Sequence, residues 1–331
     1  MKRKHRLLRI AVYCLIAITC ITLYAFISFK QSAAEIEKEW SNYKAPIIRD
    51  FGSTESLAIL PLVNWHANDP SLKTEAGVSY LIKTDTQTIL FDVGFNKHKE
   101  SPSPIEHNMN ALGISLDDID TIFLSHAHLD HNGGQQWVDQ NTFSLGLEQT
   151  DLSDKRIYAV SPTHYPNNTV EVIPEPSVIA PGVASLGAIS RQLAIGRIEE
   201  QALVINVKGK GLVVIVGCGH QTVPKLITRT QDVFGESIYG LIGDLHYPIP
   251  TGRLNLLGIN LQKFLASGEG PHSPVTFDTM VRDLKMLQEN KLQVIGLGAH
   301  DTSDEAIDYF KSRFSDAYHP VLVGEWIRLS E

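Results

Sequence analysis

Thr121-Ile-Phe-Leu-Ser-His126-Ala-His128-Leu-Asp130-His131 carries more information about fold and chemistry than any other stretch of this 331-residue sequence. Its first half is a short apolar run of strand length, and its second half places three histidines and one aspartate within six residues. Side chains of these types suit Zn²⁺ or Fe²⁺. A histidine-rich surface loop is the alternative interpretation, and the position directly after a buried strand argues against it.

The spacing of these four side chains favours two metal ions over one. A single short turn cannot direct all four comfortably at the same ion. His126 and His128 can chelate one ion, while Asp130 and His131 can turn toward a second. Two ions bridged by a water-derived hydroxide would provide a nucleophile at neutral pH and a Lewis acid for the attacked group. The stretch therefore predicts one part of a two-metal hydrolytic site.

Three further strand candidates also end in a histidine or an aspartate. They run into His220, Asp244 and His300, and each of these residues has a glycine close by that fits a sharp turn or a close backbone approach. Several strand ends can converge on one edge of a fold. We therefore expect these three side chains to lie near residues 126–131.

Short apolar runs alternate with helical patterns from about residue 57 to the end of the chain. This alternation predicts an α/β fold in which helices cover sheets. We expect helices beginning near Val223 and Phe277 and running to about residues 230 and 287. Strands are expected at residues 79–83, 88–92, 121–124, 202–207, 212–216, 238–242 and 294–297.

The first thirty residues predict a membrane anchor. A basic head precedes residues 10–29, which carry no charge and are numerous enough to cross a bilayer as a helix. A cleaved signal peptide is the alternative, but the apolar run is long and lacks the usual small-residue cleavage site directly after it. The positive-inside rule then places the chain after Phe29 on the extracytoplasmic side of a single-pass membrane protein.

The remaining chain divides into a stalk and one catalytic domain. Residues 31–53 mix charges with aromatic residues and are expected to form a juxtamembrane stalk, and residues 54–331 are expected to form the domain. Residues 1–30 hold six of the 29 basic residues and none of the 37 acidic ones, which leaves a net charge of −14 on residues 31–331. This charge disfavours nucleic acid as a partner and is compatible with a small-molecule substrate.

The sequence resembles the metallo-β-lactamase fold superfamily of metal-dependent hydrolases, whose signature is H-x-H-x-D-H. Residues 89–94, Ile-Leu-Phe-Asp-Val-Gly, look like the family's strand that ends in a supporting aspartate, here Asp92. Residues 217–220 and 242–246, the helix from Phe277 and the ending 323–329 look more narrowly like the branch related to dihydropterin ribofuranosylaminobenzene phosphate synthase.

The resemblance implies a four-layer αββα sandwich after the N-terminal transmembrane helix, and two divalent metal ions, with zinc expected. It implies that one ion is held by His126, His128 and His220. It implies that Asp130, His131 and His300 hold the other, that Asp244 bridges the two, and that Asp130 acts as the catalytic residue by orienting the attacking hydroxide or taking its proton.

Departures from the branch leave some assignments open. The segment Gly243-Asp244-Leu-His246 replaces the branch's Gly-Gly-Phe-His, so either Asp244 or His246 is expected to touch metal. His300-Asp-Thr-Ser replaces His-Cys-Thr-Gly, which predicts a changed substrate pocket. Cys218 can be a soft ligand or a small apolar residue at a buried strand end. His272 lies in a Pro/Gly-rich loop of the kind that often contacts substrate.

The function that the sequence favours is hydrolysis of an ester, a lactone or a phosphoester. An iron-dependent redox enzyme on the same scaffold is one alternative, because imidazole and carboxylate ligands also bind iron. A metal-binding sensor domain without turnover is another, and loss of a ligand would favour it. All the ligand residues implied by the signature are present, so the hydrolase is preferred.

Overall fold

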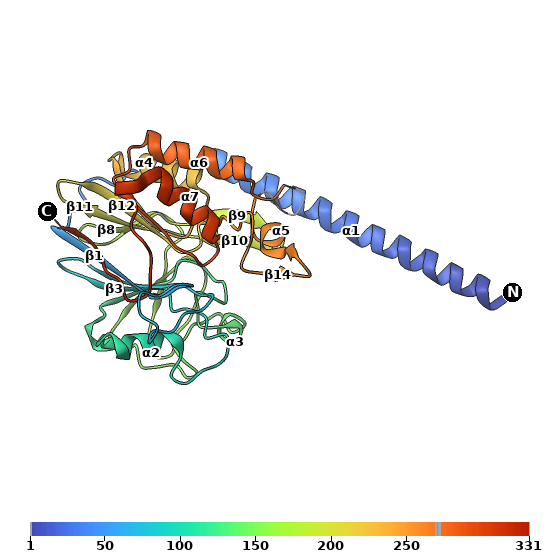
Figure 1. Ribbon diagram of the computed structural model, residues 1–331, viewed down its shortest axis with the longest axis horizontal. Helices are drawn as coiled ribbons and strands as arrows, with labels where there is room; N and C mark the ends of the chain where they lie inside the picture. Colours follow the sequence, from blue (N-terminus) through green and yellow to red (C-terminus); the bar gives the residue numbers. More distant parts are fainter. Residues whose placement is uncertain (1, 269, 271–272, 331) are drawn as a thin grey trace.

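The computed structural model describes residues 2–268, 270 and 273–330 of the protein. It begins with the long helix α1 (Lys2–Asn42), whose first part stands clear of the body and whose last part packs on it (Figure 1). The helix is long and apolar enough to cross a membrane by length and composition. His272 lies outside the described residues.

The last turns of α1 are docked on the domain. Ile36 is buried, and Nζ of Lys225 lies 2.6 Å from Oε1 of Glu37. The guanidinium of Arg229 lies 4.0 Å from the centre of the Tyr43 ring. The boundary expected at residue 30 therefore falls inside a continuous helix, and residues 31–42 of the expected stalk are helical. The helix continues because residues 31–42 bury side chains against the body, where tertiary packing stabilises the extra turns.

The first sheet has seven strands in the order β17-β1-β2-β3-β4-β5-β6. Strands β3 to β6 are parallel to one another, while β1, β2 and β17 pair antiparallel. The strands are β1 (Ser56–Val63), β2 (Ser79–Lys83), β3 (Thr88–Phe91), β4 (Thr121–Phe123), β5 (Arg156–Ala159), β6 (Val170–Val172) and β17 (Ile327–Ser330).

The second sheet has six strands in the order β16-β13-β12-β11-β8-β7. The three strands β12, β13 and β16 are parallel, so their carboxyl ends lie at one edge. The strands are β7 (Ser177–Ala180), β8 (Val183–Ser185), β11 (Leu203–Val207), β12 (Gly211–Val216), β13 (Ile238–Gly243) and β16 (Val294–Leu297). Two separate hairpins are β9 (Ile189–Leu193) with β10 (Gly196–Glu200), and β14 (Asn255–Leu256) with β15 (Ile259–Asn260).

Three apolar clusters define four layers. One cluster joins the two sheets and includes Phe91, Phe123 and Val213. A second lies between the second sheet and the helices α4 (Val223–Phe234), α6 (Phe277–Glu289) and α7 (Asp304–Phe314), and a third lies between the first sheet and α2 (Pro104–Ala111). The short helices are α3 (Gln135–Val138) and α5 (Leu261–Leu265). The molecule is a helix–sheet–sheet–helix sandwich (Figure 1), as expected for this α/β fold.

Most of the expected elements are confirmed. All seven expected strands occur with ends within one residue of those predicted, and the two expected helices begin at Val223 and Phe277 but run further than their apolar periodicity indicated.

The turns after β13 and β12 need glycine. A Cβ at Gly243, whose φ is +132°, would overlap the backbone of Val216, and a Cβ at Gly219 would lie 2.6 Å from the carbonyl oxygen of Asp244.

Candidate metal centre

The 126–131 loop leaves the end of β4 and is fixed by Asp92, at the end of β3. One carboxylate oxygen of Asp92 accepts a hydrogen bond of 2.7 Å from the amide of Ser125. The other oxygen lies 2.6 Å from both the Ser125 hydroxyl and Nδ1 of His131. Asp92 is fully buried and adopts a φ of +55°, so it holds the loop as a rigid support for the histidines, as predicted for a residue that orients a ligand imidazole.

His126, His128 and His220 form the first group of candidate ligands. One ligand atom from each lies within 4.8 Å of the others, and Nε2 of His220 is 3.3 Å from Nδ1 of His128. Burial, together with the neighbouring histidines, holds the pKa of His126 and of His220 well below its usual range. Burial lowers the pKa of His128 to about 4. The three imidazoles are therefore neutral at physiological pH, the form that binds a metal ion.

Glu200, at the end of β10, holds His220 in place, and it was not among the residues predicted for the site. Its carboxylate accepts hydrogen bonds from three consecutive backbone amides, those of Cys218, Gly219 and His220, at 2.9, 3.1 and 2.7 Å. Burial raises its pKa to about 7. Nothing in the local sequence around Glu200 indicates this role, because its partners lie about twenty residues away across the fold.

Asp130, His131 and His300 form the second group. Their ligand atoms also lie within 4.8 Å of one another, and Nε2 of His300 is 3.4 Å from Oδ2 of Asp130. Burial alone would lower the pKa of His131, but the Asp92 carboxylate raises it above its usual value. Burial likewise opposes protonation of His300, yet Asp301 and Asp130 raise its pKa to about 10. Nearby carboxylates therefore make the surroundings of this group more negative than those of the first group.

Asp244 lies beside the two groups but both of its carboxylate oxygens already have partners. Oδ1 accepts from the amide of His246 at 2.8 Å and from the Thr302 hydroxyl, and Oδ2 accepts from the amide of Asp301 at 2.8 Å. Asp244 is fully buried and is not a member of any metal-ligand group among the described residues. Asp244 therefore fixes two loops through these hydrogen bonds, and the bridging role expected of it stays a prediction.

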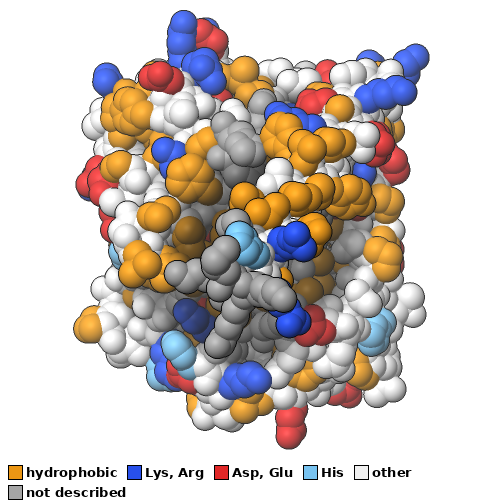
Figure 2. All heavy atoms as spheres, turned by 90° about the vertical axis from the view of Figure 1, so that its right-hand side faces the viewer, with side chains coloured by type: hydrophobic (Ala, Val, Ile, Leu, Met, Phe, Trp, Pro, Cys, Tyr) orange, Lys and Arg blue, Asp and Glu red, His pale blue; other side chains and the backbone are white. Residues whose placement is uncertain are grey.

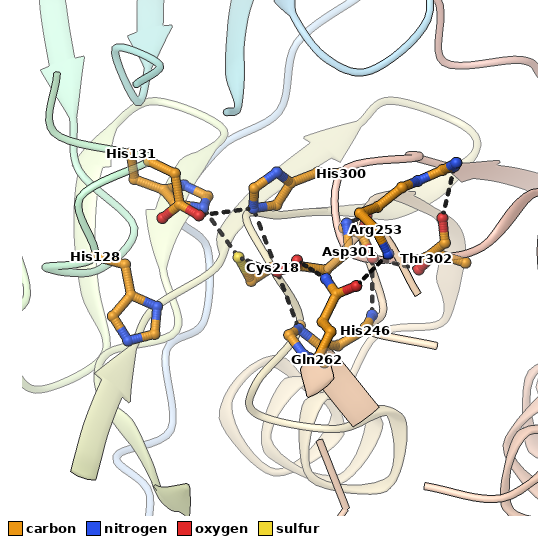
Figure 3. Close-up of polar contacts among 12 residues, drawn as sticks. His128, His131, Cys218, His246, Arg253, Gln262, His300, Asp301 and Thr302 are labelled. Atoms are coloured by element: carbon orange, nitrogen blue, oxygen red, sulfur yellow. Dashed lines mark hydrogen bonds and ion pairs between the residues drawn. The ribbon is translucent and has the colours of Figure 1, made fainter. Parts of the chain in front are cut away.

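Asp301, which was not among the predicted ligands, lies between two histidines at the centre of the site (Figure 3). Its Oδ2 lies 3.1 Å from Nδ1 of His246 and 3.3 Å from Nε2 of His300, and it accepts a 3.3 Å hydrogen bond from the thiol of Cys218. Burial alone would raise the pKa of Asp301, but His300 and His246 hold it well below its usual range. The only sequence signal for this residue was its position next to His300 in the altered His-Asp-Thr-Ser segment.

His246 and Cys218 complete a further group of candidate ligands with His220 and Asp301. His246 has a left-handed φ of +58°, which turns its ring toward that of His220, 4.7 Å away between centroids. The Cys218 sulfur also lies 2.9 Å from Nε2 of His131. Burial raises the pKa of this thiol well above its usual value. The structure therefore places Cys218 in the centre of the site, where both predicted roles, ligand and buried apolar residue, are open to it.

The donor set fits divalent metal ions. Among the described residues, Nε2 of His126, Nε2 of His246 and Oδ1 of Asp130 are buried without a hydrogen-bond partner. Burying such atoms without a partner is costly, and a metal ion with imidazole and carboxylate ligands would satisfy them. Six histidines and two carboxylates around one space provide enough ligands for two ions.

A small cavity adjoins the centre. Its volume is about 50 Å³, and its wall includes His220 and His246 on one side and residues 266–268, which follow α5, on the other. The cavity therefore borders His220 and His246 directly.

His66 lies apart from the metal groups. Its Nε2 lies 2.8 Å from Oδ1 of Asp304 on the surface.

Comparison with known proteins agrees with this architecture. Residues 72–146, which include the 126–131 loop, match the family described as the metallo-beta-lactamase superfamily. The chain is 23% identical over 246 residues to 7,8-dihydropterin-6-methyl-4-(beta-D-ribofuranosyl)-aminobenzene-5'-phosphate synthase of Methanocaldococcus jannaschii, a match that covers 60% of this chain and 81% of that protein. It is also 40% identical over 76 residues to the protein named Probable RNase MJ4 of the same organism, covering 23% of this chain and 16% of that protein.

A solved structure shares the whole fold. Tm1679, described as a metal-dependent hydrolase of the beta-lactamase superfamily, superposes with a TM-score of 0.58 at 20% identity, covering 83% of this chain and 100% of Tm1679. The shared architecture, the matched segment and the histidine loop at the sheet edge agree with one another. The chain therefore has the metallo-β-lactamase fold, and its residues 72–146 match the metallo-beta-lactamase superfamily.

Proposed function

We propose that this protein is a hydrolase that binds two divalent metal ions, with zinc expected, and cleaves an ester, a lactone or a phosphoester. The observation that carries the proposal is the pair of adjacent ligand groups, His126/His128/His220 and Asp130/His131/His300. Each group gathers three donors within 4.8 Å. A sensor domain without turnover would not need both groups to be retained.

Two bound ions would supply a hydroxide nucleophile at neutral pH and stabilise the negative charge that develops on the attacked group. Hydrolysis adds the oxygen of one water to the carbonyl carbon or phosphorus, breaks the bond to the leaving oxygen and transfers a proton to that oxygen. Asp130 is placed to hold this proton, because its Oδ2 faces His300 while its Oδ1 has no hydrogen-bond partner among the described residues.

We infer that Asp301 and His246 contribute to the ligand set in place of Asp244. The oxygen Oδ2 of Asp301 lies between the rings of His246 and His300, whereas the oxygens of Asp244 are engaged with backbone amides and a hydroxyl. A carboxylate that already accepts several hydrogen bonds has less capacity to bind a cation than one that faces histidines.

The same proposal places α1 across a membrane as a single span, with the metal centre on the extracytoplasmic side. The uncharged run at residues 10–29 and the basic head before it support this orientation. Docking of residues 32–43 on the domain would then hold the catalytic domain close to the membrane surface.

The experiment that tests the function uses the full chain purified in detergent. Bound metal is measured by mass spectrometry, and turnover is measured on phosphodiester, lactone, β-lactam and thioester substrates. We expect about two zinc ions per chain, the number that two-metal hydrolytic sites hold. Asp130→Ala should lower turnover by roughly 10²–10⁴-fold, the usual contribution of a general acid–base group.

The exposed aspartate Asp118 provides the matched control, because Asp118→Ala removes the same group from the surface. This variant should keep both metal and turnover. Wild-type turnover that persists after all metal has been removed would overturn the proposal.

A further inference from the structure

The tip of the β14–β15 hairpin presents a leucine to solvent in a conformation that leucine rarely adopts. Leu257 is 94% exposed and has a φ of +50°, followed by Gly258 with a φ of +80°. Two-residue hairpin turns with two positive φ values are normally built from Asn-Gly or Asp-Gly, whose side chains suit both the backbone and water. A bulky apolar residue at this point indicates that the tip contacts something other than water.

The leucine belongs to a continuous apolar surface, which we call the apolar rim. Its exposed residues are Ile195, Leu256, Leu257, Ile259, Phe264 and Leu265. Backbone hydrogen bonds join the three elements that carry it. The amide of Ala194 donates to the carbonyl of Leu265 at 3.0 Å. The amide of Leu261 donates to the carbonyl of Leu254, also at 3.0 Å. Exposed patches of this kind mark sites of interaction with proteins or membranes.

The apolar rim lies on the face of the body from which α1 departs. Figure 1 shows α5, β14 and the β9–β10 hairpin at this end of the body, and Figure 2 shows apolar side chains gathered on the same face. Helix α1 itself contacts this face of the body. α1 packs on β9, Ser32 bonds to Gln192, and a Cβ at Gly270 would overlap the Phe29 ring.

Phe29 is also the last residue of the uncharged run, so the level of Phe29 is the level at which the bilayer would end. The docked turns after Phe29 fix the direction of the helix relative to the body. The same bilayer surface that α1 enters therefore faces the apolar rim.

Residues next to the apolar rim are bonded to the loop at residues 299–302 of the metal centre. Gln262 of α5 donates to the carboxylate of Asp301, and Arg253, just before β14, donates to the carbonyl oxygens of Ala299 and Thr302 at 3.0 Å each. The residues directly after α5, 266–268, form the wall of the cavity that contains His220 and His246. A molecule that leaves the bilayer beside the apolar rim would thus meet the histidines first.

We propose that the apolar rim docks on the outer surface of the bilayer that α1 crosses, and that the metal centre acts on the head group of an amphiphile taken from that bilayer. The substrate class is an ester or phosphoester with at least one long apolar chain. The substrate part rests on the hydrolase function proposed above. Apolar side chains at the tip enter the acyl boundary, as in other proteins that lie on a membrane.

The docking is tested with the full chain in nanodiscs of phosphatidylcholine or of its brominated analogue, which quenches tryptophan within the acyl region. Residues 10–29 contain no tryptophan, so the span itself adds no signal. The fluorescence that Leu257→Trp adds to wild type should lose most of its intensity in brominated nanodiscs. Unchanged fluorescence would overturn the docking, and would be the result if the apolar rim faced water or a protein partner.

Ile47→Trp is the matched control. Ile47 is 65% exposed, and its neighbour Ile48 bonds to Val233 at the end of α4, whereas α4 begins next to His220. Ile47 therefore lies at the edge opposite the metal centre. The fluorescence it adds should be equal in both kinds of nanodisc.

The substrate class is tested with two esters that share one head group, a short-chain soluble ester and a long-chain ester carried in phosphatidylcholine nanodiscs. The double variant Leu256→Asp with Leu257→Asp should lower turnover of the long-chain ester roughly ten-fold and leave the soluble one unchanged, since only the former depends on contact with the interface. Equal turnover of the long-chain ester by wild type and variant would overturn the substrate class.

The two proposals fail differently. If neither ester is hydrolysed but Leu257→Trp is quenched, the hydrolase proposal fails and the docking stands. If the soluble ester is hydrolysed but Leu257→Trp is not quenched, the hydrolase stands and the docking fails. The thermal midpoint of the double variant should equal that of wild type, because both leucines are exposed.

Discussion

At the scale of single residues, the two aspartates near His300 have opposite surroundings. Asp301 faces imidazoles, and Asp244 faces backbone amides and a hydroxyl. We therefore expect Asp301→Asn to reduce the metal content of the purified protein to about one ion per chain or fewer, since it removes a charged ligand. Mass spectrometry of metal in the purified variant measures this.

Asp244→Asn should behave differently from Asp301→Asn. The metal content of Asp244→Asn should stay near that of wild type. Its thermal midpoint should fall, because an amide replaces a carboxylate that accepts three hydrogen bonds in the interior. Loss of metal from Asp244→Asn, with normal metal in Asp301→Asn, would restore the bridging role expected from sequence.

Glu75 offers a test of pH dependence away from the metals. Burial raises its pKa, although Oε1 accepts a 2.8 Å hydrogen bond from the amide of Phe95. A carboxyl whose pKa is higher in the folded state than in the unfolded state stabilises the fold below its unfolded pKa, and this stability is lost as pH rises through the folded pKa. The thermal midpoint of Glu75→Gln should therefore rise relative to that of wild type as pH is raised from 4 to 7.

The comparison between Glu75→Gln and wild type cancels the effect of protonating the metal ligands, which both proteins share. A constant difference in midpoint over this pH range would show that Glu75 does not titrate as a buried carboxyl.

At the scale of elements, α2 depends on one serine at its start. The hydroxyl of Ser103 accepts from the amide of Glu106 at 3.2 Å and donates to the carbonyl of Leu145 at 2.6 Å, and the Glu106 carboxylate bonds back to the amide of Ser103 at 2.8 Å. This reciprocal cap satisfies amides that the first helical turn leaves free. Ser103 is also fully buried.

Ser103→Ala should lower the free energy of unfolding by about 1–2 kcal/mol, since it removes both a helix cap and a buried hydrogen bond. Denaturant unfolding measures this. Ser115→Ala, which removes the cap of the short helix at Leu116–Asp118, gives a control with a smaller expected effect because Ser115 is exposed. Equal effects of the two variants would contradict the importance of burial at Ser103.

At the scale of the whole molecule, the candidate ligands come from both sheets. His126 and His131 follow the first sheet, and His220 and His300 follow the second. Metal that binds only the folded protein would therefore hold the edges of the two sheets together. Removing metal present at about 1,000 times its dissociation constant should cost about 4 kcal/mol of stability.

For a domain of this size that loss corresponds to a fall in thermal midpoint of roughly 10 °C. Chelation followed by a thermal scan measures it, and added zinc should reverse it. A midpoint that does not respond to chelation would mean that the ligand groups do not contribute to folding through bound metal.

The sequence alone determined seven of the thirteen strands in the two sheets and most of the ligand candidates. Short apolar runs between turn residues were enough to locate these seven strands, because burial of a strand requires consecutive apolar residues. The 126–131 run was recognisable because its donors are adjacent in the chain. The same holds for His220 and His300, which stand directly after apolar strands.

Only the tertiary structure decided the contacts between distant residues. Glu200 meets the amides of the loop at His220, Asp301 lies between His246 and His300, and residues 31–42 continue α1 because they pack on the domain. The apolar rim likewise became visible only when Ile195, Leu257 and Leu265 were brought to one face. Local sequence reports propensity and burial, whereas these pairings depend on how loops from separate strands meet at one edge, which no short stretch encodes.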